Sequence, residues 1–306
     1  MMMMELNRSH AIASIVAILP LLCGCLSRAI EPKPGLVQAD GPLKMDWADW
    51  GAVLGQICDG DRVDYDRLLE DSRAIDRFFA RVALVGPRLT PGQFPDLNSR
   101  LAYAINCYNA SIVQSIVHLA SGESVTGATP LDLEHRYRFR IDGRLLCPAD
   151  LRREADSFAG DDWRVRFAVC DGHLTGPALS RRVILPDMLD AQLNELVRAA
   201  VASPRVVAVS HLLSKQLLLW HGLYEISGRL VGDYEKRVHT RDASILSVLL
   251  DWSDPDRRAE LNAAVGYEVA VLPDSGLINA VEPPTPESER SVFSKLASFT
   301  LLSPAK

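Results

Sequence analysis

The run Ala-Ile-Asn-Cys-Tyr-Asn-Ala at residues 104–110 constrains the fold more than any other part of the chain, because it lies within an apolar helical stretch from Leu101 to Leu119. It sets two amides and a phenol among apolar neighbours, and such groups need hydrogen-bond partners once they are buried. Asn106 and Asn109 lie one turn apart on one helix face, with Tyr108 to one side. A fold that buries this helix must supply polar partners at these three positions.

Two interpretations of these side chains are open. In the first, the amides satisfy backbone groups of a loop and fix a crossing between the helix and a sheet. In the second, Asn106, Tyr108 and Asn109 line a cleft and bind a ligand or orient a catalytic group. The first is favoured, because polar groups in an otherwise apolar helix more often specify packing.

Composition and charge narrow the classes of function. The chain has 306 residues, 48% hydrophobic and 24% charged, which is enough for one large domain or two modest ones. Its net charge of -6 and pI near 5.7 come from interspersed acids and bases, without the basic stripe that nucleic-acid binding requires. Gly-rich phosphate loops, His-Glu-x-x-His and Gly-x-Ser-x-Gly are absent from the sequence. Neither nucleic acid nor a cofactor is expected to bind.

The N-terminus is typical of an exported protein. Arg8 and His10 precede an apolar run at residues 11–22, which is short for a membrane span but suits a signal peptide. The following Leu-Cys-Gly-Cys, ending at Cys25, resembles a bacterial lipobox, in which Cys25 becomes the lipidated first residue of the mature protein. An ordinary signal peptide cut near residues 27–29 is the alternative, but only the lipobox requires a cysteine at this position.

We therefore expect a periplasm-facing lipoprotein of the bacterial cell envelope, with the membrane as a partner through its N-terminal lipid. Leu26, rather than an aspartate, follows Cys25, so nothing indicates retention in an inner membrane and an outer-membrane location is favoured. Four cysteines remain after the signal: Cys58, Cys107, Cys147 and Cys170. Their irregular spacing and the apolar setting of Cys107 favour separate buried thiols over a disulfide scaffold.

The rest of the chain is interpreted as one helix-rich α+β domain at residues 45–281 with a small, mostly antiparallel sheet. A Pro- and Gly-rich tether at residues 26–44 precedes it, and a flexible or weakly docked tail follows at 282–306. Periodicity predicts helices at residues 47–57, 68–82, 101–119, 148–155, 186–203, 212–226 and 245–252. Strands are predicted at residues 137–141, with an Asp142-Gly143 hairpin turn, and at 165–170, 206–209 and 267–272.

Four elements together resemble the domain of unknown function 547 family over most of residues 45–281. They are the Val-Asp-Tyr at residues 63–65, the helix at 101–113 with its two asparagines and tyrosine, the segment 164–169, and the helix at 187–200. The first half matches closely, in order and spacing. The second half departs at chemically important positions.

The family usually has an adjacent Glu and His on a short helix, where this chain has Arg152 and Arg153, although Glu134 and His135 offer the same pair earlier. Three further family positions are changed. Arg166 stands where the resemblance implies a histidine, Asp171 where it implies a first cysteine, and Gly176 where it implies a second; near the end, Pro273-Asp274-Ser275 aligns only loosely with a Tyr-Asp-Trp. A neighbouring Cys and His is the minimum for a thiolate nucleophile, so these departures predict a binding or scaffolding module.

Some local chemistry remains at residues 170–173, Cys-Asp-Gly-His. In a catalytic interpretation Cys170 is the nucleophile, a histidine such as His173 or His135 is its base, and Asp171 orients that base. In the alternative, Cys170 ends a buried strand, the next two residues make a turn, and His173 is solvated. A zinc site from Cys170, His173 and either Cys147 or His135 lacks the paired spacing of known zinc motifs, and no metal is expected.

Two hypotheses follow. The first is an envelope lipoprotein that acts as a ligand- or protein-binding or scaffolding module, with an envelope protein or a small ligand as partner. The second is a thiol-dependent hydrolase or acyltransferase that acts on envelope peptide or peptidoglycan material through Cys170.

Overall fold

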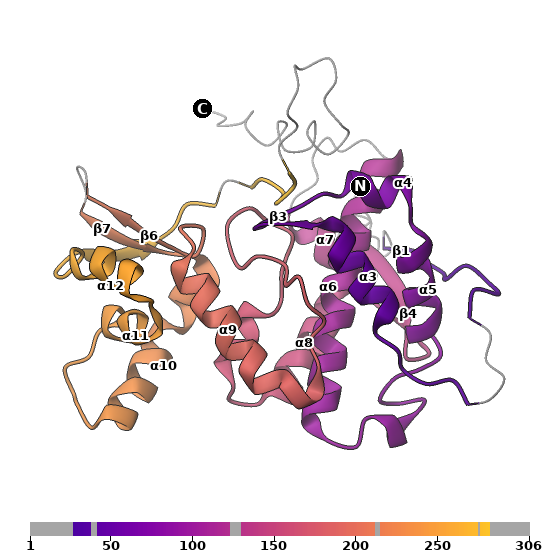
Figure 1. The fold of residues 1–306 in the computed structure, drawn as a ribbon, viewed down its shortest axis with the longest axis horizontal. Helices are drawn as coiled ribbons and strands as arrows, with labels where there is room; N and C mark the ends of the chain where they lie inside the picture. The colour runs from indigo at the N-terminus through magenta and orange to yellow at the C-terminus, as the bar shows by residue number, and fades with distance from the viewer. Residues whose placement is uncertain (1–26, 38–41, 123–129, 212–214, 275, 282–306) are drawn as a thin grey trace, which may run out of the picture.

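The computed structural model describes residues 27–37, 42–122, 130–211, 215–274 and 276–281 (Figure 1). Helices make up 52% of it, and the strands form small mixed sheets of two or three strands, so the α+β class predicted from sequence is confirmed. The predicted signal peptide at 1–25, with the predicted lipidation site Cys25, and the predicted tail at 282–306 lie outside the described residues. Among the described residues, no helix combines the length and apolarity that a bilayer crossing would need.

The N-terminal half is built around α6 (Leu97–Gly122), which begins four residues before the predicted start. A separate 3-10 helix, η1 (Pro91–Gln93), precedes it, with Thr90 at its N-cap position and Pro91 as its first residue. Every α6 residue from 101 to 117 is buried, and Gln114 is the most exposed of them at 8%. A helix that is buried on all sides forms the centre of a core rather than its edge.

Shorter elements surround α6. The first group comprises α3 (Ala48–Ile57), β2 (Cys58–Asp59), β3 (Arg62–Val63), α4 (Asp66–Glu70), α5 (Arg73–Val82) and α7 (Pro130–His135). The second comprises β4 (Tyr137–Ile141), β5 (Arg144–Leu146) and α8 (Pro148–Ala159), which packs along α6. The hydroxyl of Tyr103 on α6 donates to the carbonyl oxygens of Val82 and Val85 at 3.2 and 2.9 Å, and so satisfies the end of α5.

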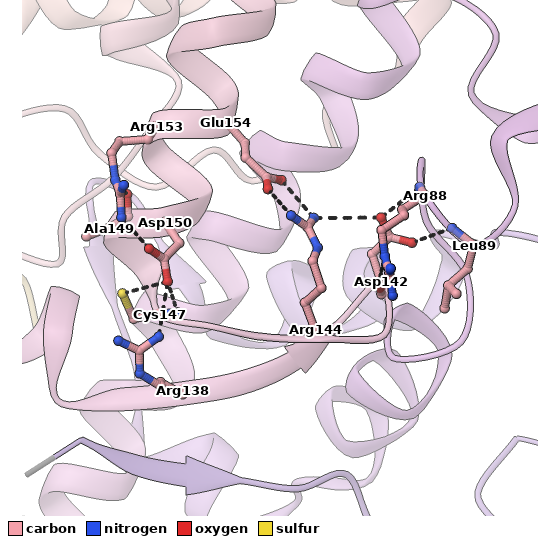
Figure 2. Close-up of polar contacts among 10 residues, drawn as sticks. All are labelled: Arg88, Leu89, Arg138, Asp142, Arg144, Cys147, Ala149, Asp150, Arg153 and Glu154. Atoms are coloured by element: carbon pink, nitrogen blue, oxygen red, sulfur yellow. Dashed lines mark hydrogen bonds and ion pairs between the residues drawn. The ribbon is translucent and has the colours of Figure 1, made fainter. Parts of the chain in front are cut away.

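The predicted β4–β5 hairpin is present, and its turn residue Asp142 anchors a neighbouring loop (Figure 2). Asp142 has a positive φ of 51°, and its carboxylate accepts the backbone N–H groups of Arg88 at 2.7 Å and Leu89 at 2.8 Å. Arg144 lies 3.7 Å from the same carboxylate and 2.6 Å from Glu154 on α8. The network ties the hairpin to both the loop and α8.

The start of α8 uses a cysteine as its cap (Figure 2). The Cys147 thiol lies 3.1 Å from the Asp150 carboxylate, which also accepts the Cys147 backbone N–H at 2.9 Å and lies 3.3 Å from Arg138. Pro148 occupies the first helical position, where a missing N–H costs nothing. The cysteines at 58, 107, 147 and 170 are all buried and unbridged, so the prediction of separate thiols is confirmed.

The C-terminal half has its own hydrophobic cluster, around Val207, Leu219 and Leu249, and lies to one side of the α6 core (Figure 1). Its elements are η2 (Trp163–Phe167), η3 (Pro186–Met188), α9 (Leu189–Ala202), β6 (Val207–Ser210), β7 (Gln216–Leu219), α10 (His221–Val238), α11 (Ile245–Trp252), α12 (Pro255–Asn262) and β8 (Glu268–Val271). β7 is the middle strand of its sheet, antiparallel to β6 and parallel to β8. The predictions for α9, α11, β6 and β8 are confirmed to within a few residues.

Three predicted elements were wrong. Residues 68–82, predicted as one helix, belong to two, because α4 ends before Asp71 and α5 begins after Ser72. Residues 165–170, predicted as a strand, form the end of η2 and a loop, because the side chain of Asn109 takes the backbone groups that a sheet partner would have bonded. The stretch 212–226, predicted as one helix, contains β7 and the start of α10, with Trp220 between them, and its residues 212–214 lie outside the described residues. A short apolar run fits a buried strand and a buried helix equally well, and here pairing with β6 and β8 decided the outcome.

The tether prediction also needs correction, because the fold does not begin at Met45. Strand β1 (Arg28–Ile30) pairs in parallel with β4, which places it at the edge of a β1–β4–β5 sheet. Two ion pairs hold the segment after it: Glu31 bonds Arg140 through both carboxylate oxygens at 2.7 Å, and Lys33 lies 2.5 Å from Asp76. Residues 28–33 are thus part of the domain.

Candidate functional site

The two asparagines of α6 bind buried backbone. Asn106 donates to the carbonyl oxygen of Ile184 at 2.8 Å and accepts the Ile184 N–H at 3.1 Å. Asn109 donates to the Ala168 carbonyl oxygen at 2.9 Å and accepts the Cys170 N–H at 2.9 Å. Each amide therefore replaces a strand partner, and together they hold both ends of the segment 168–184 against α6.

Tyr108, between them in sequence, faces a different neighbour. Its hydroxyl donates to the Glu134 carboxylate on α7 at 2.9 Å, and the same carboxylate oxygen lies 3.2 Å from Arg152 on α8. Burial first, and then the negative charge of Glu134, raise the pKa of Tyr108, so the phenol stays protonated and remains a donor. The buried phenol thus holds the Glu134 carboxylate in place, and Glu134 in turn positions Arg152.

That pair forms part of the wall of a pocket of about 680 Å³ at the junction of the two hydrophobic clusters. Its other walls come from η2, the loop that follows residue 170, the start of α10 and the segment after β8. The lining residues are Glu134, Arg152, Arg166, Asp171, His173, Thr175, Trp220, His221, Gly222, Glu225, Val271, Leu272, Pro273 and Asp274. Pockets of this size that lie between structural units are common ligand sites.

Asp171 and His173 form an acid–imidazole pair in this pocket. The Asp171 carboxylate accepts the His173 backbone N–H at 3.0 Å and lies 3.4 Å from Nδ1 of the ring. Burial alone would lower the pKa of His173, but the hydrogen bond and charge of Asp171 outweigh it and raise that pKa. Burial would likewise raise the pKa of Asp171, and the bonds and charge of His173 lower it instead. Each partner favours the charged form of the other.

Cys170 precedes this pair but does not line the pocket. It is 4% exposed, and burial, followed by the charge of Asp171, raises the pKa of its thiol to about 12. Its sulfur accepts a 3.5 Å contact from the Asn279 amide, whose oxygen accepts the Tyr65 hydroxyl at 2.7 Å. At neutral pH this thiol is protonated and enclosed by the core, whereas a thiol nucleophile needs thiolate character and access.

The structure thus brings together some of the residues that sequence singled out and separates others. Asp171 and His173 lie in the pocket, Tyr108 lies behind its wall, and Asn106 and Asn109 are bonded to backbone. His135, the alternative base, is the last residue of α7, exposed and outside the lining.

Several positions at which the chain departs from the resembled family lie in the same pocket, although Arg153 and Gly176 do not line it. Arg152, Arg166 and Asp171, together with the loosely aligned Asp274, all line it. Trp220, His221 and Glu225 are lining residues that sequence reasoning missed, because residues 212–226 were interpreted as one apolar helix. The one available signal was the polar pair four residues apart at 221 and 225, whose side chains lie 3.4 Å from each other.

Among the described residues, no three His, Cys, Asp or Glu side chains are placed to hold a metal ion. Of the zinc ligands considered, Cys147 is committed to capping α8. Comparison with models of known protein families, with curated proteins and with solved structures finds no match for this chain. The resemblance to the domain of unknown function 547 family therefore stays a hypothesis.

Proposed function

We propose that this protein is a ligand-binding module of the bacterial cell envelope, and that the pocket at the junction of the two hydrophobic clusters holds the ligand. The observation that carries the proposal is the concentration of charged side chains on its walls. Arg152 on α8, Arg166 on η2, Glu225 on α10 and the loop pair Asp171 and His173 meet around one volume of about 680 Å³. Such a convergence of polar groups on a concave surface is typical of small-molecule sites.

The state of the thiols supports binding over thiol-dependent catalysis. Cys170, the nucleophile that sequence suggests, is 4% exposed and has a pKa of about 12. Cys58 and Cys107 are also buried, and burial raises the pKa of each thiol. At neutral pH few of these thiols are therefore ionised, so little thiolate is available for catalysis at the pocket.

The second candidate function is the thiol-dependent hydrolase or acyltransferase acting on envelope peptide or peptidoglycan material. One observation favours it: Asp171 is disposed toward His173 as an orienting acid is toward a general base. It requires Cys170 to ionise and to reach the pocket. Thiol labelling, described below, separates the two functions.

A pocket-filling variant tests the proposed binding. Val271 lines the pocket and is 41% exposed, so Val271→Trp narrows the pocket at little cost in stability. Val238→Trp is the matched control, because Val238 is 43% exposed, ends α10 and does not line the pocket. In thermal-shift screening of a library of small polar compounds, we expect hits that stabilise the wild type and Val238→Trp but not Val271→Trp. Absence of any hit, or equal stabilisation of both variants, would contradict the proposal.

A further inference from the structure

The arginines of the pocket have unused hydrogen-bond donors. A guanidinium carries five N–H donors in a planar fork. Arg152 uses one on Glu134 at 3.2 Å, and Arg166 uses one on Glu225 at 3.1 Å. The side chains are 27% and 33% exposed, so their remaining donors are only partly hydrated. Such groups are suited to bind a carboxylate or phosphate through two parallel bonds.

Arg152 is the better placed of the two. Its partner Glu134 is itself held by the fully buried Tyr108, so the guanidinium is fixed before a ligand arrives. Arg166 pairs with the half-exposed Glu225, which also lies 3.4 Å from His221. The deeper pair provides a rigid oxyanion site and the outer pair a more mobile one.

The carboxylates of the pocket are already engaged, with one exception. Glu134, Glu225 and Asp171 each accept from a cationic side chain. Asp274 is exposed, and among the described residues its carboxylate accepts one hydrogen bond, from the backbone N–H of Gly276 at 3.0 Å. Its charge reaches His173, whose pKa it helps to raise. Asp274 is therefore the acid that can receive a cationic group of a ligand.

The balance of charge restricts what kind of anion can bind. Two arginines and four carboxylates line the pocket, which gives a formal charge of -2 before the histidines are counted and -1 when His173 is protonated beside Asp171, so the pocket stays negative in either state. A phosphate or another dianion would gain guanidinium bonds but would face that negative field. A zwitterion adds no net charge, and its ammonium group finds a partner.

Resting on the proposed binding function, we infer that the ligand is a small zwitterion, an amino acid or a short peptide, with its carboxylate on Arg152 and its ammonium group on Asp274. The carboxylate replaces water on the spare guanidinium donors. The pocket volume of about 680 Å³ leaves room for side chains beside the apolar surfaces of Trp220 and Leu272. Occupancy would bridge the two hydrophobic clusters, since Arg152 belongs to one side and Asp274 to the other.

Pools of dipeptides covering the common amino acids provide the test, in three forms: free termini, N-acetylated and C-amidated, with inorganic phosphate as a fourth probe. Binding is measured by thermal shift and calorimetry. We expect the free pool to stabilise the protein, each blocked pool to bind at least about tenfold more weakly, and phosphate to have no effect, because each block removes one charge-assisted bond. If blocked and free pools bind alike, or if phosphate alone binds, the inference is overturned while ligand binding stands. If neither pools nor library compounds bind, both fail.

Two variants assign the ends of the ligand. Arg152→Lys keeps the charge and loses the fork, so the preference for a free carboxylate over an amide should shrink about tenfold. Asp274→Asn should abolish the preference for a free amino terminus over an acetylated one, and Asp256→Asn on α12, outside the pocket, should leave both preferences unchanged. Melting without ligand checks that each variant is folded. Unchanged preferences in folded Arg152→Lys and Asp274→Asn would refute the assignment.

Discussion

Asp142 is packed directly over Gly86, so that a Cβ atom added at Gly86 would lie 2.5 Å from the carboxyl carbon of Asp142. Asp142 cannot move away, because it is 1% exposed and holds the N–H groups of Arg88 and Leu89. The contact therefore requires glycine for its lack of a side chain and not for its backbone angles.

We predict that Gly86→Ala lowers the free energy of unfolding by about 1–3 kcal/mol, through overpacking against a fixed side chain. Gly92→Ala is the matched control, because a Cβ there meets no atom within 4 Å. Urea denaturation measures both. Equal stabilities for the two variants would show that the loop yields to Asp142 without strain.

Asn109 should be needed for both stability and binding. Asn109→Ala leaves the Ala168 carbonyl and the Cys170 N–H buried without their partner, at a cost of about 1–3 kcal/mol for each group. Because the next residue, Asp171, lies in the pocket, we also expect weaker ligand binding in calorimetry at a temperature where the variant is folded. Asn106→Ala, which frees Ile184 far along the same segment, should cost similar stability and leave affinity closer to that of the wild type. Identical ligand affinity in the wild type, Asn109→Ala and Asn106→Ala would contradict the different roles assigned to the two asparagines.

The Asp171–His173 pair predicts a defined pH dependence. The pKa of His173 is raised, so its stabilising contribution is complete below the ordinary value of about 6.5 and is lost as the pH rises through the folded pKa. The pKa of Asp171 is lowered, so its contribution is present above about 3.9 and is lost as the pH falls through its folded pKa. The pair should stabilise the fold most between those values.

Titration of the His173 ring by NMR checks the cause. In the wild type we expect an apparent pKa above the ordinary value for histidine. In Asp171→Asn the lowering effect of burial is opposed only by the charges of Asp274 and Glu134, so the pKa of His173 should fall relative to the wild type. A pKa that does not change in the variant would remove Asp171 as the cause of the shift.

Thiol labelling separates the two candidate functions. Cys170 should react with a thiol-specific probe only when the protein unfolds, because it is 4% exposed and its pKa is about 12. Val271→Cys, with a thiol at the pocket rim, provides the positive control. Fast labelling of Cys170 at neutral pH in the folded wild type would instead support the thiol-dependent enzyme.

The proposed envelope location depends on Cys25. We predict that Cys25→Ser abolishes incorporation of a labelled lipid and moves the protein out of the membrane fraction. Replacing the neighbouring Cys23 with Ser should leave lipid labelling intact. If Cys25→Ser partitions as the wild type does, the lipoprotein proposal is refuted.

The sequence predicted those helices and strands whose hydrophobic periodicity and turn residues lie within the element itself. The α6 helix, the β4–β5 hairpin with its Asp142-Gly143 turn, and α11 are encoded by periodicity and turn residues within the segment. β1, β7 and the loop at 168–170 depend on partners distant in sequence, namely β4, the β6 and β8 strands, and Asn109. A single sequence holds no local mark of those pairings.

The same distinction applies to the candidate site. The demand that Asn106 and Asn109 have partners could be predicted from their apolar surroundings, but the identity of those partners, Ile184 and the 168–170 loop, could not. Asp171 and His173 were found because only one residue separates them in sequence. Arg152 was noticed only as a departure from a family pattern, since its relation to Glu134 and Tyr108 arises from the packing of three separate helices.

The parallel pairing of β1 with β4 also sets how far the domain can stand from a membrane. With a lipid on Cys25, only Leu26 and Ser27 separate the anchor from Arg28, the first residue of β1, and that distance cannot exceed about 11 Å. A flexible tether running to residue 44 would have allowed a distance of roughly 60 Å between the anchor and the domain. As long as β1 stays in the sheet, a lipidated molecule would remain close to the bilayer surface. Its ligand would then have to bind at that surface rather than at a distance from the membrane.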